Sequence, residues 1–106
     1  MRLSVENKIL GLIGLCKRAG KLVTGEQAVL DYIKKSAYLV IIANDTSEST
    51  KKKLTDKCKS YNVRYIIFSD KVTLGTYTKK EYAASVSIND INFAKQIEKL
   101  YLEYFS

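Results

Sequence analysis

The segment Tyr38-Leu-Val-Ile-Ile-Ala43 decides the fold class of this chain. All of its residues are apolar or aromatic, and its valine and two isoleucines are β-branched. A continuous apolar run of this kind, instead of an alternating one, is typical of a strand that is buried on both faces. The next residues, Asn44-Asp-Thr-Ser47, have the side chains of turns and helix caps. The segment therefore predicts the central strand of a sheet that is covered on both sides.

Helical and strand periods alternate on either side of this segment. The predicted helices run from about Ser4 to Gly20, from Thr24 through Ile33, through Leu54 to Tyr61, and from about Phe93 to Tyr104 behind a cap at Asn89 or Asp90. The other predicted strands cover 21–23, 63–68 and 84–88, with a short helical turn at 69–74 followed by a polar loop. In 84–88, apolar residues alternate with Ser85 and Ser87. This order of elements predicts a three-layer α/β/α sandwich around a four-stranded mixed sheet.

Length and composition exclude several classes of protein. A chain of 106 residues, 46% of them hydrophobic, is expected to form a single domain, residues 1–106. Histidine is absent, and Cys16 and Cys58 are far apart, so we expect reduced thiols, no disulfide, no metal and no cofactor. Catalytic sites that depend on imidazole are therefore excluded, and no Ser/Lys, cysteine or paired-carboxylate arrangement is recognisable, so we do not expect an enzyme. The longest apolar run is too short to span a membrane and the first residues do not form a signal peptide, so we expect a cytoplasmic protein.

The net charge of +7 is unevenly distributed along the chain. Residues 1–80 contain 16 lysines and arginines against 7 acidic residues, whereas residues 81–106 contain 2 against 4. A basic surface of this kind attracts polyanions and speeds their encounter. Charge alone does not distinguish RNA from DNA or from an anionic lipid surface.

The stretch from Cys16 to Leu30 combines a basic turn with the start of a helix. Lys17, Arg18 and Lys21 surround Gly20, which we expect to end the first helix. Thr24 is followed three residues later by Gln27, which matches the capping-box pattern at a helix start. Unpaired backbone N–H groups at such a start favour anions. The sequence therefore predicts that phosphate groups bind here.

The chain resembles the ribosomal L-seven-Ae family of RNA-binding proteins, and within it the small bacterial YlxQ-like members. The likeness lies in Gly-Leu-Cys-Lys-Arg-Ala-Gly-Lys-Leu-Val-Thr-Gly-Glu-Gln-Ala-Val (14–29), Leu-Val-Ile-Ile-Ala-Asn-Asp-Thr-Ser (39–47) and Lys-Lys-Lys-Leu (51–54), and continues through 68–75 and 83–88. The resemblance implies an α/β/α sandwich. It also implies a protein without catalytic activity that binds structured RNA, ribosomal or otherwise linked to translation.

The resemblance further implies where RNA is contacted. In the family, a Gly-x-Asn-Glu segment and a lysine one helical turn later read the sheared G·A pairs of a kink turn. Here Gly25 matches the glycine, whereas Gln27, Ala28 and Asp31 replace the other three residues. The loop before the last strand is the family's second contact region, and it corresponds to Lys79, Lys80, Glu81 and Tyr82. The expected RNA contacts are Lys17, Arg18, Gly20, Lys21, Thr24, Gly25, Glu26, Gln27, Lys79, Lys80, Glu81 and Tyr82.

Several alternatives stay open at this point. The Gln27 side chain either contacts a base or bonds back to the N–H of Thr24, and Tyr82 either stacks on a base or covers the edge of the sheet. Tyr101, Tyr104 and Phe105 exceed what one buried stripe needs, which favours a second hypothesis: an adaptor that binds a ribosomal protein or a translation factor. A third is a substrate-recognition domain that acts with a separate RNA-modifying enzyme.

Overall fold

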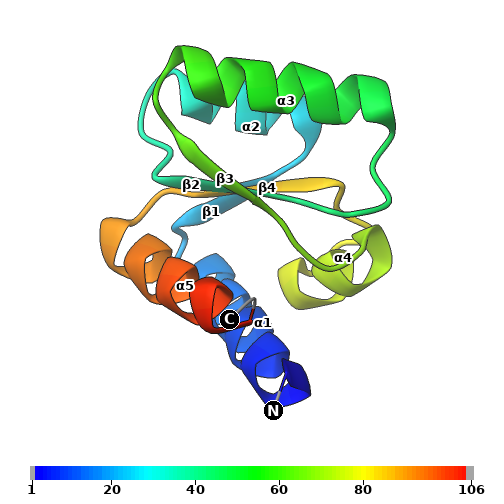
Figure 1. Cartoon of the computed structure of the whole chain (residues 1–106), viewed down its shortest axis with the longest axis vertical. Coiled ribbons are helices and arrows are strands. Elements are labelled where there is room, and N and C mark those ends of the chain that lie inside the picture. The colour runs from blue at the N-terminus through cyan, green and yellow to red at the C-terminus, as the bar shows by residue number, and fades with distance from the viewer. Residues whose placement is uncertain (1, 105–106) are drawn as a thin grey trace.

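The computed structural model describes residues 2–104 of the chain. Its elements are α1 (Arg2–Arg18), β1 (Leu22–Thr24), α2 (Glu26–Ile33), β2 (Leu39–Ile42), α3 (Glu48–Ser60), β3 (Arg64–Ile67), α4 (Lys71–Thr78), β4 (Ser85–Ile88) and α5 (Ile91–Tyr104). Helices α2 and α3 cover one face of the sheet, and α1 and α5 cover the other, where α4 packs beside α1 (Figure 1). The three-layer α/β/α sandwich predicted from the sequence is confirmed.

The sheet is mixed, with the strand order β1-β4-β2-β3. Strands β2 and β3 are parallel, and β4 runs antiparallel to both β1 and β2. Consequently β1, β2 and β3 all point in one direction, and the helix that follows each of them starts at the same end of the sheet. We call this end the carboxyl end of the sheet, and the opposite end the amino end.

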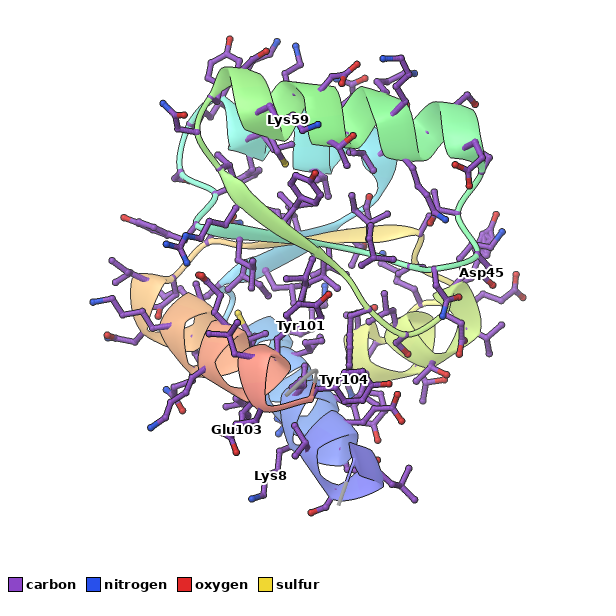
Figure 2. All side chains as sticks on the ribbon, viewed as in Figure 1. Lys8, Asp45, Lys59, Tyr101, Glu103 and Tyr104 are labelled. Carbon is purple, nitrogen blue, oxygen red and sulfur yellow. The ribbon has the colours of Figure 1, made fainter. Side chains whose placement is uncertain are left out.

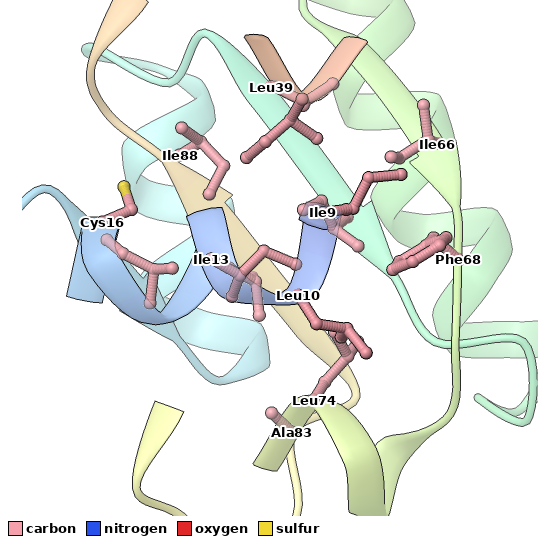
Figure 3. Packing of buried hydrophobic residues seen from close by; sticks show 14 of the residues in the cluster. Ile9, Leu10, Ile13, Cys16, Leu39, Ile66, Phe68, Leu74, Ala83 and Ile88 are labelled. Atoms are coloured by element: carbon pink, nitrogen blue, oxygen red, sulfur yellow. The ribbon is translucent and has the colours of Figure 1, made fainter. Parts of the chain in front are cut away.

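The core lies on both sides of β2, as the apolar run in the sequence predicts. Leu39 and Ile41 face α1 and α5, whereas Val40 and Ile42 face α2 and α3. Figure 3 shows the first of these layers, in which Ile9 and Ile13 of α1 pack under the sheet. All of these side chains are buried. Successive side chains of a strand point to opposite faces, so burial of all of them requires a sheet that is covered on both faces, here by helices.

Both cysteines are buried and free, as expected. Burial raises the pKa of Cys16 to about 12, an effect to which Asp90 adds and which Lys21 opposes. The Cys16 thiol also donates a hydrogen bond to the carbonyl of Lys21. Burial raises the pKa of Cys58 to about 11. Both thiols are therefore protonated at neutral pH and act as apolar packing groups.

The structure adds one detail to the predicted elements and corrects another. All four residues of β4 are buried, the two serines included, because β4 lies between β1 and β2 and α2 packs over it. The predicted helical turn at 69–74 is instead the two-turn helix α4, which extends into the expected loop. Its last residue, Thr78, is buried and donates to the carbonyl of Leu74. Tertiary packing thus overrides local polarity in both cases.

The ends of the remaining elements agree well with the sequence. The N–H groups of Gly20 and Lys21 donate to carbonyls in the last turn of α1, as expected for a helix that ends just before a glycine. Asp90, not Asn89, caps α5 by accepting from the N–H of Phe93. Helix α1 covers Arg2–Arg18, close to the predicted range from about Ser4 to Gly20.

Within residues 2–104, no helix is both long and apolar enough to cross a membrane. The same described part of the chain has no group of three or more His, Cys, Asp or Glu side chains that could hold a metal ion.

Candidate nucleic-acid interface

The start of α2 is built without a side-chain cap. Gly25 is the N-cap, with φ 97° and ψ 142°, and no side chain bonds to the first-turn N–H groups. The predicted capping box is wrong, because Thr24 is the last residue of β1 and the Gln27 amide nitrogen instead donates to Asp31, 3.1 Å away. The first-turn N–H groups of α2 are therefore available to an external acceptor.

Two other helices begin beside α2, and both are capped from within the protein. The Ser47 hydroxyl accepts from the N–H of Thr50 in α3, and the Asp70 carboxylate accepts from the N–H of Thr73 in α4. The N–H of Lys71, the first residue of α4, also donates a hydrogen bond to the Asp45 carboxylate. Figure 2 shows Asp45 beside α4. Of the three helix starts at the carboxyl end of the sheet, only α2 is left open to a ligand.

A cleft of about 550 Å³ lies in front of these helix starts. It brings together five of the residues expected to contact RNA. These are Thr24, Gly25, Glu26, Lys80 and Tyr82. The cleft also includes Thr46, Ser47, Thr50 and Lys71, which the sequence analysis did not select. The cap chemistry at 44–47, combined with the rule that ligands bind at the carboxyl ends of parallel strands, is the signal that could have found them.

The loop at 79–84 forms the other wall of this cleft. The N–H of Lys80 donates to Gly75, and the N–H of Ala83 donates to Lys71, so the loop is held against α4. Gly75 allows this approach, since a Cβ there would lie 2.6 Å from the Cα of Tyr82. The side chain of Tyr82 is 60% exposed. Of the two alternatives for this ring, the exposed orientation favours stacking on a ligand over covering the sheet.

Glu26 joins α2 to α3. Its carboxylate accepts hydrogen bonds from Lys53 at 2.8 Å and from Thr50 at 3.5 Å. The hydrogen bond from Lys53 lowers the pKa of Glu26 below its ordinary value, with smaller contributions from the charge of Lys53 and from Thr50 and an opposing one from desolvation. Lys53, one of the three consecutive lysines at 51–53 in α3, is therefore held in an ion pair within the protein.

The expectation that Lys17, Arg18 and Lys21 border the start of α2 is wrong. Lys21 lies at the amino end of the sheet, where its carbonyl accepts from Asn89, whereas Gly25 donates to Ser85 at the carboxyl end. The extended strand β1 separates the two groups by roughly 13 Å. Lys17 and Arg18 lie in the last turn of α1 and Lys21 directly precedes β1, which is an edge strand, so we call the three the β1-edge cations. Gly20 lies beside them, and neither Lys79 nor Glu81 lines the cleft.

Tyr101 and Tyr104 of α5 make contacts with other parts of the same fold. Tyr101 packs against the core and its hydroxyl donates to the carbonyl of Ile67 at 3.5 Å. The Tyr104 ring meets Phe68 edge-to-face with 5.8 Å between centroids, and its hydroxyl donates to Glu6. Figure 2 shows both rings between α5 and the rest of the fold. These contacts remove the sequence-based reason for treating them as an interface, and Phe105 lies outside the described residues.

Fold and cleft together define a small α/β/α protein with a cleft at the carboxyl end of its sheet, where three helices begin. Comparison with known proteins is more specific. The chain belongs to the ribosomal protein L7Ae/L30e/S12e/Gadd45 family, whose model matches residues 7–98. The resemblance inferred from the sequence motifs is thereby confirmed.

Similar proteins cover most of the chain. It is 39% identical over 90 residues to RNA-binding protein YlxQ of Bacillus subtilis strain 168, covering 84% of this chain and 90% of the relative. It is 40% identical over 95 residues to RNA-binding protein YlxQ of Enterococcus faecium, and the match covers 88% of this chain and 90% of that relative. A Bacillus halodurans protein of unknown function has a similar structure, with a TM-score of 0.85, 34% identity and coverage of 88% and 95%. The Giardia lamblia 15.5kD RNA binding protein shares the fold at a TM-score of 0.74 and 20% identity, with coverage of 92% and 90%.

Proposed function

We propose that this protein binds structured RNA without catalysing a reaction, and that the RNA occupies the cleft at the carboxyl end of the sheet. Two relatives at about 40% identity are named as RNA-binding proteins, and the family includes ribosomal proteins. The observation that carries the proposal is the uncapped start of α2, which opens into a cleft that also contains Lys71, Lys80 and the exposed ring of Tyr82.

Each part of the cleft has a distinct task in this proposal. The first-turn N–H groups of α2 and the two lysines hold phosphates and fix the register of the RNA. The Tyr82 ring stacks on an unpaired base, a contact that contributes about 1 to 3 kcal/mol. Gln27 does not line the cleft but follows Glu26 in α2. Its amide nitrogen donates to Asp31, so its amide oxygen remains to accept a hydrogen bond from a base edge. Glu26 contributes to specificity by fixing the position of α2 through its bond to Lys53.

The β1-edge cations, Lys17, Arg18 and Lys21, extend the same interface. An RNA strand that leaves the cleft at Gly25 and follows the open edge of β1 reaches them after about 13 Å. They lie beside Gly20, which keeps the turn free of a side chain. At the other wall of the cleft, Lys79 and Glu81 are exposed next to Lys80 and flank the path of the RNA. Contacts of the lysines and the arginine with phosphates strengthen binding without selecting a sequence, whereas Glu81 repels phosphate and limits how closely the backbone approaches there.

The family supports a proposal for the class of RNA. Ribosomal or other translation-linked RNA in the cytoplasm is the proposed target, since the family description names ribosomal proteins. Ala28 offers no side-chain acceptor, and the Asp31 carboxylate is bonded to Gln27, so the surface differs from a Gly-x-Asn-Glu reader of kink turns. Crosslinking in cells followed by sequencing of the attached RNA identifies the target and shows whether it contains a kink turn.

Binding measurements with the recovered RNA test the cleft directly. We expect Tyr82→Ala and Lys80→Ala each to weaken binding by about tenfold in fluorescence anisotropy, because each removes a stacking or phosphate contact. Tyr61→Ala and Lys52→Ala are matched controls, since both side chains are exposed outside the cleft. Gln27→Ala is expected to change the preference among RNAs more than the overall affinity. Wild-type binding by both cleft variants would place the RNA elsewhere.

A further inference from the structure

A second groove lies at the opposite end of the sheet. It runs between the turn at 37–38, the residues 62–64 that lead into β3, and the outer face of α5 from Ile91 to Leu102. Its volume is about 560 Å³, which is close to that of the proposed RNA cleft and within the range of ligand sites. No residue is shared between the two. An occupant of this groove therefore leaves the RNA cleft free.

The walls of this α5 groove expose unusually apolar side chains. Leu102 is 70% exposed, Tyr38 is 47% exposed and Ile91 is 46% exposed. Val63 and Ala94 form more of its lining. Exposed leucine, isoleucine and tyrosine side chains along one groove favour a polypeptide over a nucleic acid, because an RNA backbone gains nothing by covering leucine and isoleucine. The groove thus favours a polypeptide.

The charges around the groove are predominantly positive. Arg64 is bonded to Glu98 across it at 3.0 Å, which neutralises the one acidic residue of the lining. Lys95 and Lys99 lie on the same face of α5, and neither forms an ion pair within residues 2–104. A two-fold pairing of this surface with itself would place like charges together, so a second copy of this chain is disfavoured. An acidic partner has the complementary charge.

We propose that the α5 groove binds an acidic segment of a partner protein, anchored by an apolar side chain between Leu102 and Tyr38. The anchor is buried against the exposed apolar residues, and the flanking carboxylates pair with Lys95 and Lys99. The proposal is independent of the RNA function, because the two surfaces lie at opposite ends of the sheet.

Peptide selection on the intact chain tests this proposal. A library of random peptides is selected on the immobilised protein in the presence of competitor RNA, which occupies the other cleft. The selected peptides are expected to combine aspartate or glutamate with leucine, isoleucine or phenylalanine. Fluorescence polarisation of one such labelled peptide then gives its affinity, and amide shift perturbation by NMR locates it on the protein.

Matched variants separate the groove from the general surface. Leu102→Ser and Lys99→Glu are each expected to weaken peptide binding by about tenfold. Leu3→Ser, at a residue 68% exposed on α1, and Lys8→Glu, at the side chain labelled in Figure 2, are expected to leave it unchanged. RNA affinity stays close to wild type in Leu102→Ser. Shift perturbations confined to the RNA cleft, selection of peptides without acidic or apolar residues, or equal effects of the groove and control variants would overturn the proposal.

Discussion

At the residue scale, Gly25 determines how the chain leaves β1 and enters α2. Its φ of 97° and ψ of 142° lie in a region that residues with a Cβ rarely adopt. A Cβ placed there would meet no atom within 4 Å, so the requirement for glycine comes from the backbone conformation and not from lack of space. This conformation directs the uncapped N–H groups of α2 toward the cleft.

Replacement of Gly25 isolates that conformational requirement. We expect Gly25→Ala to lower the free energy of unfolding by about 1 to 3 kcal/mol, measured by urea denaturation, since alanine is strained at this φ. Gly11→Ala is the control, because Gly11 is an exposed residue inside α1 with open space around it. That change is expected to stabilise the protein by up to about 1 kcal/mol. Equal stability of Gly25→Ala and wild type would contradict the argument.

At the scale of elements, the bond between Glu26 and Lys53 ties α2 to α3. Because Lys53 lowers the pKa of Glu26 in the folded protein below the ordinary 4.5, ionised Glu26 favours folding. This contribution is present above the pKa of glutamate in the unfolded chain and is lost as the pH falls through the lower, folded pKa. The ion pair between Glu26 and Lys53 therefore stabilises the fold at neutral pH, and this stabilisation is lost in acid.

The pH dependence of two variants tests this tie. Glu26→Gln is expected to have a lower urea midpoint than wild type at pH 7, and the difference should shrink in acid. Glu48→Gln is the control, since Glu48 is 91% exposed in its ion pair with Lys51 and such pairs contribute little. A constant difference between Glu26→Gln and wild type across the acid range would show that the charge of Glu26 is not involved.

Helix α4 and the loop at 79–84 form one packed unit through Gly75. A Cβ at this position would lie within 3 Å of backbone atoms of Lys80 and Tyr82, so the loop has to move. We expect Gly75→Ala to lower both the stability and the affinity for RNA, because the displaced loop carries Tyr82. Urea denaturation and anisotropy measure the two effects. In the control Gly11→Ala, the new Cβ meets no atom within 4 Å, and RNA binding should persist.

At the scale of the whole molecule, the proposed RNA path connects the two ends of the sheet along β1. Binding should therefore weaken steeply with salt, by about 0.7 to 0.9 in log K per unit of log salt for each phosphate contact. Lys21→Ala is expected to reduce this slope by about that amount and to lower the affinity for all RNAs alike. Lys8→Ala, on the exposed side of α1, should leave the slope unchanged. A salt-independent affinity would argue against phosphate contacts altogether.

The sequence by itself determined the order of the elements, the central position of β2 and the family. These features depend on local periods and short motifs: the run at 38–43 is apolar at every position because both faces of β2 are covered, and the motif at 14–29 is contiguous. Local polarity was a weaker guide for β4, where Ser85 and Ser87 are buried with the apolar residues.

Only the tertiary structure decided which side chains share a surface. Strand pairing places Lys21 beside Asn89 and Gly25 beside Ser85, so cations that are adjacent to Gly25 in sequence lie at the other end of β1. The same pairing brings Lys71 and Lys80 to the start of α2 from more than forty positions away. The physical reason is that periodicity in the sequence indicates only whether each residue is buried or exposed. A site depends on contacts between distant segments, and the strand order and register of the sheet set those contacts.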